Sequence, residues 1–278
     1  MRFLSTPDGL TLGLHEHGGA GRPTLFAHAT GFHGAVWEPF SAALGATFER
    51  WAVDFRAHGA STVPRGSDLH WDGMASDVLT VVDALAVPQG QLLGVGHSMG
   101  GACLLLAEQA RPGTFAGLWL FEPIAPSGGV LSADGANPLA EGALRRRATF
   151  PSLAEAVANF AAKPPFSTLR ADALHAYVRH GFTPGEDGAV HLACRPEDES
   201  AVYRGGGTHG AFAHLAEVRC PVVVACSGDV NGPASFAPPI AEALPDGQLE
   251  RHRHVGHFGP LEAPTALAAS VRSFAARC

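Results

Sequence analysis

The sequence contains almost no lysine. Lys163 is the only one among 278 residues, so arginine carries nearly all of the positive charge. A mechanism in which a lysine forms a Schiff base with its substrate is therefore excluded unless Lys163 itself carries it. Lys163 stands directly before two prolines, a setting typical of the end of a helix.

Charged residues as a whole are scarce, at 16% of the chain, and 19 Lys+Arg against 26 Asp+Glu give a net charge of -7. This mildly acidic balance argues against a protein that binds nucleic acid or an anionic membrane surface. The chain also lacks any uninterrupted apolar run of the roughly eighteen residues that a membrane span requires. We therefore expect neither a nucleic acid nor a membrane as the partner, while the oligomeric state has no signature in the sequence.

The cysteines show no paired spacing, and their number is odd. No Cys-x-x-Cys occurs, so the pattern indicates neither a zinc ribbon nor a disulfide framework. The N-terminal residues lack the apolar run of a signal peptide. We expect buried or incidental thiols in a cytoplasmic protein. The five are Cys103, Cys194, Cys220, Cys226 and Cys278.

Short apolar runs alternate with helical patterns along most of the chain. The runs have the length and the Gly, Pro and Asp flanks of buried parallel strands, and helical patterns over 71–87 and 99–111 separate them. Such alternation predicts an α/β fold whose mostly parallel sheet is covered by helices on both faces. The predicted strands are 24–29, 51–53, 91–96, 117–121 and 221–226.

The alternation stops after Phe121 and resumes with the strand at Pro221. We predict a division into a core of residues 1–125 and 215–278 and a helical cap of residues 126–214, inserted between late core strands. The alternative, extra helices packed beside the sheet, stays open. The aromatic candidates for pocket walls in this insertion are Phe160, Phe166 and Phe182.

A nucleophile motif stands between a predicted strand and a predicted helix. The residues are Gly96-His-Ser98-Met-Gly-Gly, and a serine on such a sharp turn projects its hydroxyl at the carboxyl edge of the sheet. The Met99 N–H, free at the start of the helix, can donate to an oxyanion. The pattern predicts that Ser98 is a catalytic nucleophile.

A serine nucleophile requires a base, and fifteen histidines compete for the role. His257 precedes the last predicted helix, 263–276, so its loop can reach the sheet edge. His252 and His254 alternate with arginines along a polar strand and are interpreted as surface residues. These histidines lack a carboxylate or cysteine at metal-ligand spacing, so we predict no metal site.

Four segments resemble those of the α/β-hydrolase superfamily. They are His28-Ala-Thr-Gly-Phe, Asp54-Phe-Arg-Ala-His-Gly-Ala-Ser61, Gly96-His-Ser-Met-Gly-Gly, and Gly256-His-Phe with Glu262 and Pro264 behind it. The resemblance covers nearly all of the chain outside 126–214. It implies the α/β-hydrolase fold and a Ser-His-acid triad, and says little about the substrate.

The resemblance also implies roles for further residues. The loop after the first central parallel strand supplies the second oxyanion donor, which here is the Thr30 N–H. The segment of Asp54, Arg56 and His58 organises a neighbouring loop. The acid of the triad is Asp229, which follows a buried strand and keeps the order Ser, Asp, His. Glu122, at the end of the preceding strand, is the alternative acid, because some relatives place it there.

These residues imply a serine hydrolase that cleaves a small ester, lactone or amide through an acyl-enzyme and requires no metal or organic cofactor. A serine nucleophile argues against the dehalogenase and epoxide-hydrolase branches, which use a carboxylate there. Two alternatives stay open. One is a carbon–carbon bond hydrolase or cofactor-free peroxidase with the same triad, and the other is a non-catalytic protein that binds a small molecule.

Overall fold

A mostly parallel sheet forms the centre of the protein. The computed structural model describes residues 1–128 and 137–278, and within them this sheet has eight strands in the order β1-β2-β4-β3-β5-β6-β10-β11. The pairs β1–β2 and β2–β4 are antiparallel and the other pairs are parallel, which confirms the predicted fold class. The strands are β1 (Arg2–Ser5), β2 (Thr11–Gly18), β3 (Arg22–Ala27), β4 (Phe48–Val53), β5 (Leu92–His97), β6 (Phe115–Phe121), β10 (Val222–Ser227) and β11 (Gly247–His252).

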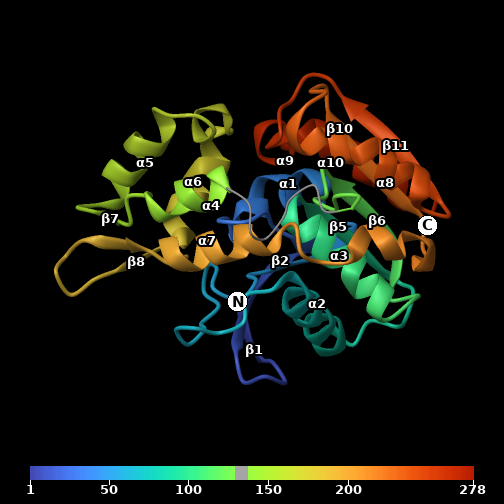
Figure 1. Cartoon of the computed structure of the whole chain (residues 1–278), viewed down its shortest axis with the longest axis horizontal. Helices are drawn as coiled ribbons and strands as arrows, with labels where there is room; N and C mark the ends of the chain where they lie inside the picture. Colours follow the sequence, from blue (N-terminus) through green and yellow to red (C-terminus); the bar gives the residue numbers. More distant parts are fainter. Residues whose placement is uncertain (129–136) are drawn as a thin grey trace.

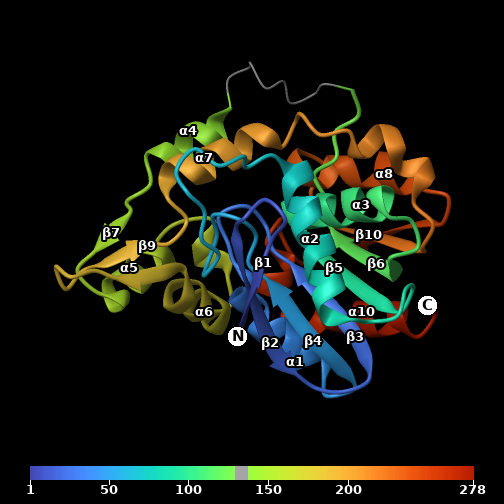
Figure 2. The same ribbon diagram turned by 90° about the horizontal axis from the view of Figure 1, so that it is seen from below.

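Helices cover both faces of the sheet (Figure 2). In β10, Val222 and Val224 pack into one apolar core, while Val223 and Ala225 pack into the other. A strand buried on both sides has no polar face, and this explains the continuous apolar runs in the sequence. The first core contains α2 (Trp71–Leu85), α3 (Met99–Ala110) and α8 (Ala237–Ala243), and the second contains α1 (Glu38–Leu44) and α10 (Pro264–Ala275).

The parallel strands place several loops at one edge of the sheet. Because β3, β5, β6 and β10 run in the same direction, the loops that follow them emerge side by side. These loops begin at residues 28, 98, 122 and 228. Residues 253–258, between β11 and the short helix α9 (Gly259–Glu262), join them. Ligands of open α/β sheets bind outside the carboxyl ends of the strands, so this edge is the place to look for a site.

The segment predicted as a cap forms a separate group of elements beside the sheet (Figure 1). It combines helices with a small antiparallel sheet in the order β7-β9-β8, which the sequence did not predict because these strands are two or three residues long. Residues 129–136 of the predicted cap lie outside the described residues. The elements are α4 (Pro138–Leu144), β7 (Thr149–Phe150), α5 (Leu153–Ala161), α6 (Ala171–Gly181), β8 (Phe182–Pro184), β9 (Val190–Leu192) and α7 (Pro196–Gly205).

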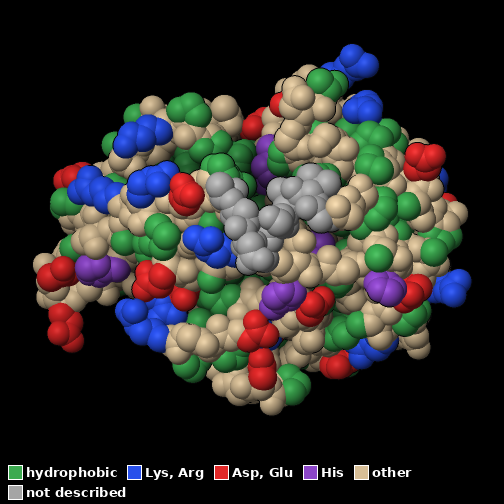
Figure 3. Space-filling model, viewed as in Figure 1, with side chains coloured by type: hydrophobic (Ala, Val, Ile, Leu, Met, Phe, Trp, Pro, Cys, Tyr) green, Lys and Arg blue, Asp and Glu red, His purple; other side chains and the backbone are tan. Residues whose placement is uncertain are grey.

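Short 3₁₀ helices connect several of these elements. They are η1 (Gly34–Trp37), η2 (Phe166–Thr168), η3 (Ala211–Glu217) and η4 (Gly232–Phe236). Among the helices that the structure describes, none is long and apolar enough to cross a membrane. On the face drawn in Figure 3, acidic and basic side chains are interspersed, in keeping with a chain that carries few charges and both signs.

Candidate active site

Ser98 occupies a strained turn between β5 and α3. Its φ of 55° and ψ of −117° lie outside the backbone regions that non-glycine residues usually adopt. Three backbone hydrogen bonds hold the turn: Ser98 N–H donates to Phe121 O (2.9 Å), and Ser98 O accepts from Ala102 N–H (3.2 Å) and Ile124 N–H (3.3 Å). A non-glycine residue kept in such a conformation by its surroundings is a feature of functional sites.

Glycines on either side make this turn sterically feasible. A Cβ at Gly100 would lie 2.3 Å from Ala27 O, and a Cβ at Gly96 would lie 2.7 Å from the Gly101 Cα. Helix α3 can therefore approach β3 and β5 closely only because these side chains are missing. Ser98 is thereby held at the amino end of α3, where the helix has unpaired N–H groups.

His257 and Glu122 form a hydrogen-bonded pair at the same edge. Glu122 Oε2 lies 2.6 Å from His257 Nδ1. Glu122 directly follows β6, whose residue Phe121 is in register with His97 of β5, so Glu122 and Ser98 leave adjacent strands at the same level. His257 is fixed a second time, because His97 Nε2 donates to its backbone oxygen at 2.8 Å.

The Glu122 carboxylate is buried, with a side chain that is 1% exposed, and it also accepts a hydrogen bond from Ser227 N–H at 2.8 Å. Burial raises the pKa of Glu122, but its contacts with His257 and Ser227 lower it more strongly, and the net pKa lies below that of an ordinary glutamate. The group is therefore an anion at neutral pH, directed at the imidazole.

Asp229, the preferred acid of the sequence analysis, is not the carboxylate that contacts His257 here; the alternative, Glu122, is. Asp229 is exposed, and Oδ1 of its side chain accepts from Asn231 N–H at 3.1 Å. The reason lies in what surrounds each carboxylate. Glu122 is buried against His257 and Ser227, whereas Asp229 bonds to the backbone of its own loop. The signal in the sequence for Glu122 was a charged residue at the end of an apolar strand, where core packing does not account for it.

The two predicted oxyanion donors belong to loops that touch each other. Met99 is the first residue of α3, so its N–H has no partner inside the helix. Thr30 lies in the loop after β3, and its hydroxyl donates to Met99 Sδ at 3.4 Å. The next amide of that loop, Gly31 N–H, donates to His58 Nε2 at 3.0 Å. Thr30 therefore lies against the turn that carries Ser98.

Two buried histidines hold the loop of Thr30 in place. His28 Nδ1 donates to Ala29 O (2.8 Å) and its Nε2 accepts from Phe55 N–H (3.1 Å). His58 Nδ1 donates to Arg56 O (2.9 Å), which leaves its Nε2 to accept from Gly31. Burial lowers the pKa of both rings, so they stay neutral and keep these tautomers.

Asp54 and Arg56, which the resemblance assigns to loop organisation, make contacts of that kind. Asp54 accepts hydrogen bonds from Gly34 N–H (2.6 Å) and Ala60 N–H (2.8 Å). Burial raises its pKa, but its partners, above all His15, outweigh burial and lower the pKa to about 2. Arg56 pairs with the buried Asp77 at 2.6 Å. Both side chains are occupied in holding backbone.

The three predicted pocket aromatics do not occupy equivalent places. Phe166 stacks on Phe32 (ring centroids 5.7 Å apart), and Phe32 packs on Phe258 (5.4 Å), the neighbour of His257. Phe160 lies behind Phe166 at 4.7 Å. Phe182 packs instead on Phe150 at 5.7 Å, within the cap segment itself. Phe166 is thus the ring of the three that is linked most directly to the site.

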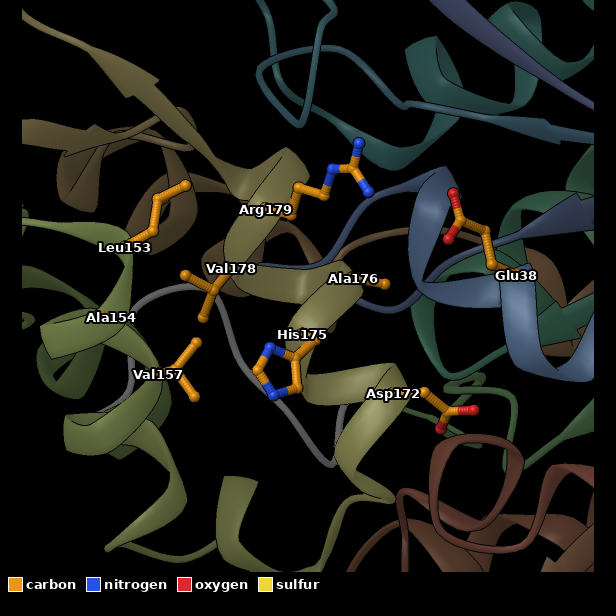
Figure 4. A pocket seen from close by; sticks show the side chains of 9 residues that line it. All are labelled: Glu38, Leu153, Ala154, Val157, Asp172, His175, Ala176, Val178 and Arg179. Carbon is orange, nitrogen blue, oxygen red and sulfur yellow. The ribbon is translucent and has the colours of Figure 1, made fainter.

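A separate hollow of about 800 Å³ lies between α5, α6 and the start of α1 (Figure 4). None of the predicted catalytic residues lines it, so it is not part of the candidate active site. Its walls are Glu38, Leu153, Ala154, Val157, Asp172, His175, Ala176, Val178 and Arg179. Within residues 1–128 and 137–278, no group of three or more His, Cys, Asp or Glu side chains is arranged to hold a metal ion.

Six curated proteins match part of the chain, and two of them illustrate the similarity. Protein phosphatase methylesterase 1 of Rattus norvegicus is 35% identical over 96 residues, which are 33% of this chain and 25% of that protein. Monoglyceride lipase of Homo sapiens is 36% identical over 103 residues, which are 35% of this chain and 33% of the lipase. The chain therefore spans no more than a third of the length of either relative.

A solved structure and a family model match a much larger part of the chain than these curated proteins do. The crystal structure of E-2-(acetamidomethylene)succinate hydrolase matches with a TM-score of 0.79 at 21% identity and covers 98% of this chain and 97% of its own. At that identity the likeness shows the fold alone. A sequence model of the alpha/beta hydrolase family matches residues 24–270. The chain belongs to the alpha/beta hydrolase family.

Proposed function

We propose that this protein is a serine hydrolase that cleaves a small carboxylic ester, with lactones and amides as related substrates, through an acyl-enzyme. The observation that carries the proposal is the arrangement of three side chains at the carboxyl edge of the sheet. Ser98 stands there in its strained turn, and the adjacent strand delivers a buried carboxylate, Glu122, that is 2.6 Å from His257. This is the constellation that activates a weak nucleophile.

The proposed reaction begins with attack of Ser98 Oγ on the substrate carbonyl carbon. Because Glu122 occupies Nδ1 of His257, the imidazole accepts the serine proton at Nε2. Glu122 holds this tautomer and stabilises the imidazolium that forms. The N–H groups of Met99 and Thr30 stabilise the negative charge that develops on the carbonyl oxygen.

His257 then gives its proton to the departing alcohol, and the acyl group remains bonded to Ser98. In the second half, His257 removes a proton from water, the hydroxide attacks the acyl carbon, and Ser98 recovers its proton as the acid leaves. We assign Asp229 no part in these steps. Residues 126–214 would act as the cap that supplies the walls of the substrate pocket.

An ester is favoured over the carbon–carbon bond and peroxidase alternatives for two reasons. The curated relatives are named as a methylesterase and a lipase. In addition, a vinylogous diketone substrate would require a free arginine for its carboxylate, and Arg146, the least exposed residue of the run Arg145-Arg-Arg, is already paired with Glu199. Ester hydrolysis is thus the reaction that this set of residues supports best.

The test is turnover of p-nitrophenyl esters of increasing acyl length, with Ser98→Ala as the control variant. We expect measurable hydrolysis by the parent protein and a loss of roughly 10⁶ in kcat in the variant, as when the nucleophile of a triad is removed. A fluorophosphonate probe should label the parent protein and leave the variant unlabelled. Labelling that persists in Ser98→Ala would remove Ser98 from the mechanism.

A further inference from the structure

A buried ion pair lies inside the cap segment. Arg146, just after α4, donates through Nη1 to Glu199 Oε2 of α7 and through Nη2 to the hydroxyl of Tyr177 on α6. The side chains of Arg146 and Glu199 are 16% and 5% exposed. One guanidinium therefore ties together three helical elements of the cap segment.

The cluster of Arg146, Glu199 and Tyr177 also lies against the loop that carries Thr30. A Cβ on Gly31, whose φ is 76°, would lie only 2.3 Å from Glu199 Oε1 and 3.3 Å from Arg146 Nη1. Glycine is thus required where the carboxylate meets the loop. The contact reaches the residue directly after Thr30.

Tyr177 extends the contact along the loop. Its ring packs on Phe32 with centroids 5.1 Å apart and stacks on His33 at 5.9 Å. Its backbone oxygen accepts a hydrogen bond from His33 Nε2 at 3.0 Å. Residues 31–33 are therefore covered by Glu199 and Tyr177 from the cap side, while the core histidines hold residues 28–31 from the other side.

We propose that Arg146, Glu199 and Tyr177 are positioning residues that fix the loop of residues 30–33 so that the Thr30 N–H is aimed at the oxyanion. This inference rests on the proposed function, because it assigns the cluster to the stabilisation of that oxyanion. The planar fork of an arginine suits the task, since it sets the angle between two partners that a lysine would leave free. The cluster touches neither Ser98 nor His257 through any hydrogen bond of its three side chains that the structure describes.

Positioning of the loop explains this cluster better than a role in stability or in anion binding does. A buried ion pair contributes little net stability compared with well-packed apolar residues of the same size. The positive charge of Arg146 is compensated by Glu199, so the cluster offers no net charge to an anionic substrate. Burial raises the pKa of Tyr177 to about 12, so its hydroxyl is neutral and serves Arg146 as a hydrogen-bond acceptor.

The experiment compares Arg146→Lys and Tyr177→Phe, both of which keep the charge balance of the cluster. Arg145→Lys is the matched control, because Arg145 is the adjacent residue, 72% exposed, and pairs only with the exposed Glu141 in the described part of the chain. We expect kcat on a p-nitrophenyl ester to fall about 10- to 100-fold in Arg146→Lys, as for a small misplacement of a reacting group, with KM changed less than about threefold. Tyr177→Phe should show the same split with a smaller loss, and Arg145→Lys should match the parent.

A second readout does not depend on activity. Amide hydrogen exchange in the peptide of residues 28–37 should be faster in Arg146→Lys than in the parent and unchanged in Arg145→Lys. Unchanged exchange or an unchanged kcat in Arg146→Lys would overturn the inference, as would a rise in KM alone or a failure of both variants to fold. If the parent protein shows no esterase activity, the proposed function fails separately, and faster exchange would still show that the cluster holds the loop.

Discussion

At the scale of single residues, the contact between Glu122 and His257 yields the sharpest expectation. Glu122→Gln keeps the shape of the side chain but replaces the anion that faces Nδ1 at 2.6 Å with an amide, which favours the wrong tautomer of the imidazole. We expect kcat to fall on the order of 10⁴-fold, as for the same exchange in a serine protease triad. The measurement is steady-state hydrolysis of p-nitrophenyl butyrate.

Asp229→Asn is the matched control, since it removes a carboxylate from a neighbouring strand end without touching His257. Its carboxylate contacts only local backbone in the described part of the chain, so we expect a change in kcat of less than about twofold. A large loss in Asp229→Asn with a mild effect of Glu122→Gln would mean that the loop of Asp229 moves onto His257 during the reaction.

The difference between Ser98 and the acid shows what a sequence can reveal about single residues. The turn that carries Ser98 was predictable because a glycine-flanked turn between strand and helix is a local feature of consecutive residues. The choice between Glu122 and Asp229 depends on which carboxylate meets His257 in space, and Glu122 and His257 are far apart in the sequence. The contact of Arg146 was beyond prediction for a similar reason, because its partner Glu199 is 53 residues away.

At the scale of elements, alanine substitutions at two helical glycines should change the free energy of unfolding in opposite directions. The first glycine, Gly100, lies where α3 packs against β3. Gly100→Ala places a Cβ 2.3 Å from Ala27 O and 2.6 Å from His28 O, so α3 must shift away from the sheet. We expect a loss of about 1–3 kcal/mol in the free energy of unfolding from overpacking. Activity should fall as well, because Ser98 and the loop of Thr30 move apart.

Gly142→Ala in α4 provides the comparison, because no atom lies within 4 Å of the Cβ it would add. Alanine there should raise the free energy of unfolding by about 0.5–1 kcal/mol, the usual difference from glycine inside a helix. Both variants can be measured by urea unfolding. Equal effects of the two substitutions would contradict the close approach of α3 to β3.

The elements themselves were predictable to different degrees. The central strands are apolar on both faces and end at Gly, Pro or Asp, so the sequence pattern locates them closely. The predicted strand 221–226, for example, corresponds to the observed strand β10 (Val222–Ser227). The strands β7, β8 and β9 are too short to show any alternation, and they are held by pairing with one another, which local sequence does not reveal.

At the scale of the whole molecule, burial of histidine is the feature with the widest consequence. Four of the fifteen histidines are 2% exposed or less, namely His28, His33, His58 and His97. Burial lowers the pKa of each, to about 4 for His33, because a charged ring is poorly solvated in the interior. These rings bond to the backbone around the candidate active site, so that the core and the loop of residues 28–33 depend on their neutral form.

This burial predicts that stability is lost on mild acidification. In the unfolded chain these histidines take up protons as the pH falls below about 6.5, whereas in the folded protein they stay neutral to a lower pH. The unfolded state therefore binds more protons in this range, and each such histidine lowers the free energy of unfolding by up to about 1.4 kcal/mol per pH unit. Asp54, with a pKa of about 2, contributes in the same direction only at a lower pH, below the ordinary value of 3.8. Urea unfolding should be measured between about pH 7.5 and about pH 5, the range in which an ordinary histidine titrates. The free energy of unfolding should decrease steadily as the pH falls. His33→Asn should make this decrease smaller, and His214→Gln, at an exposed histidine, should leave it unchanged. A free energy of unfolding that stays constant over this range would mean that the four rings take up protons in the folded protein over the same pH range as in the unfolded chain.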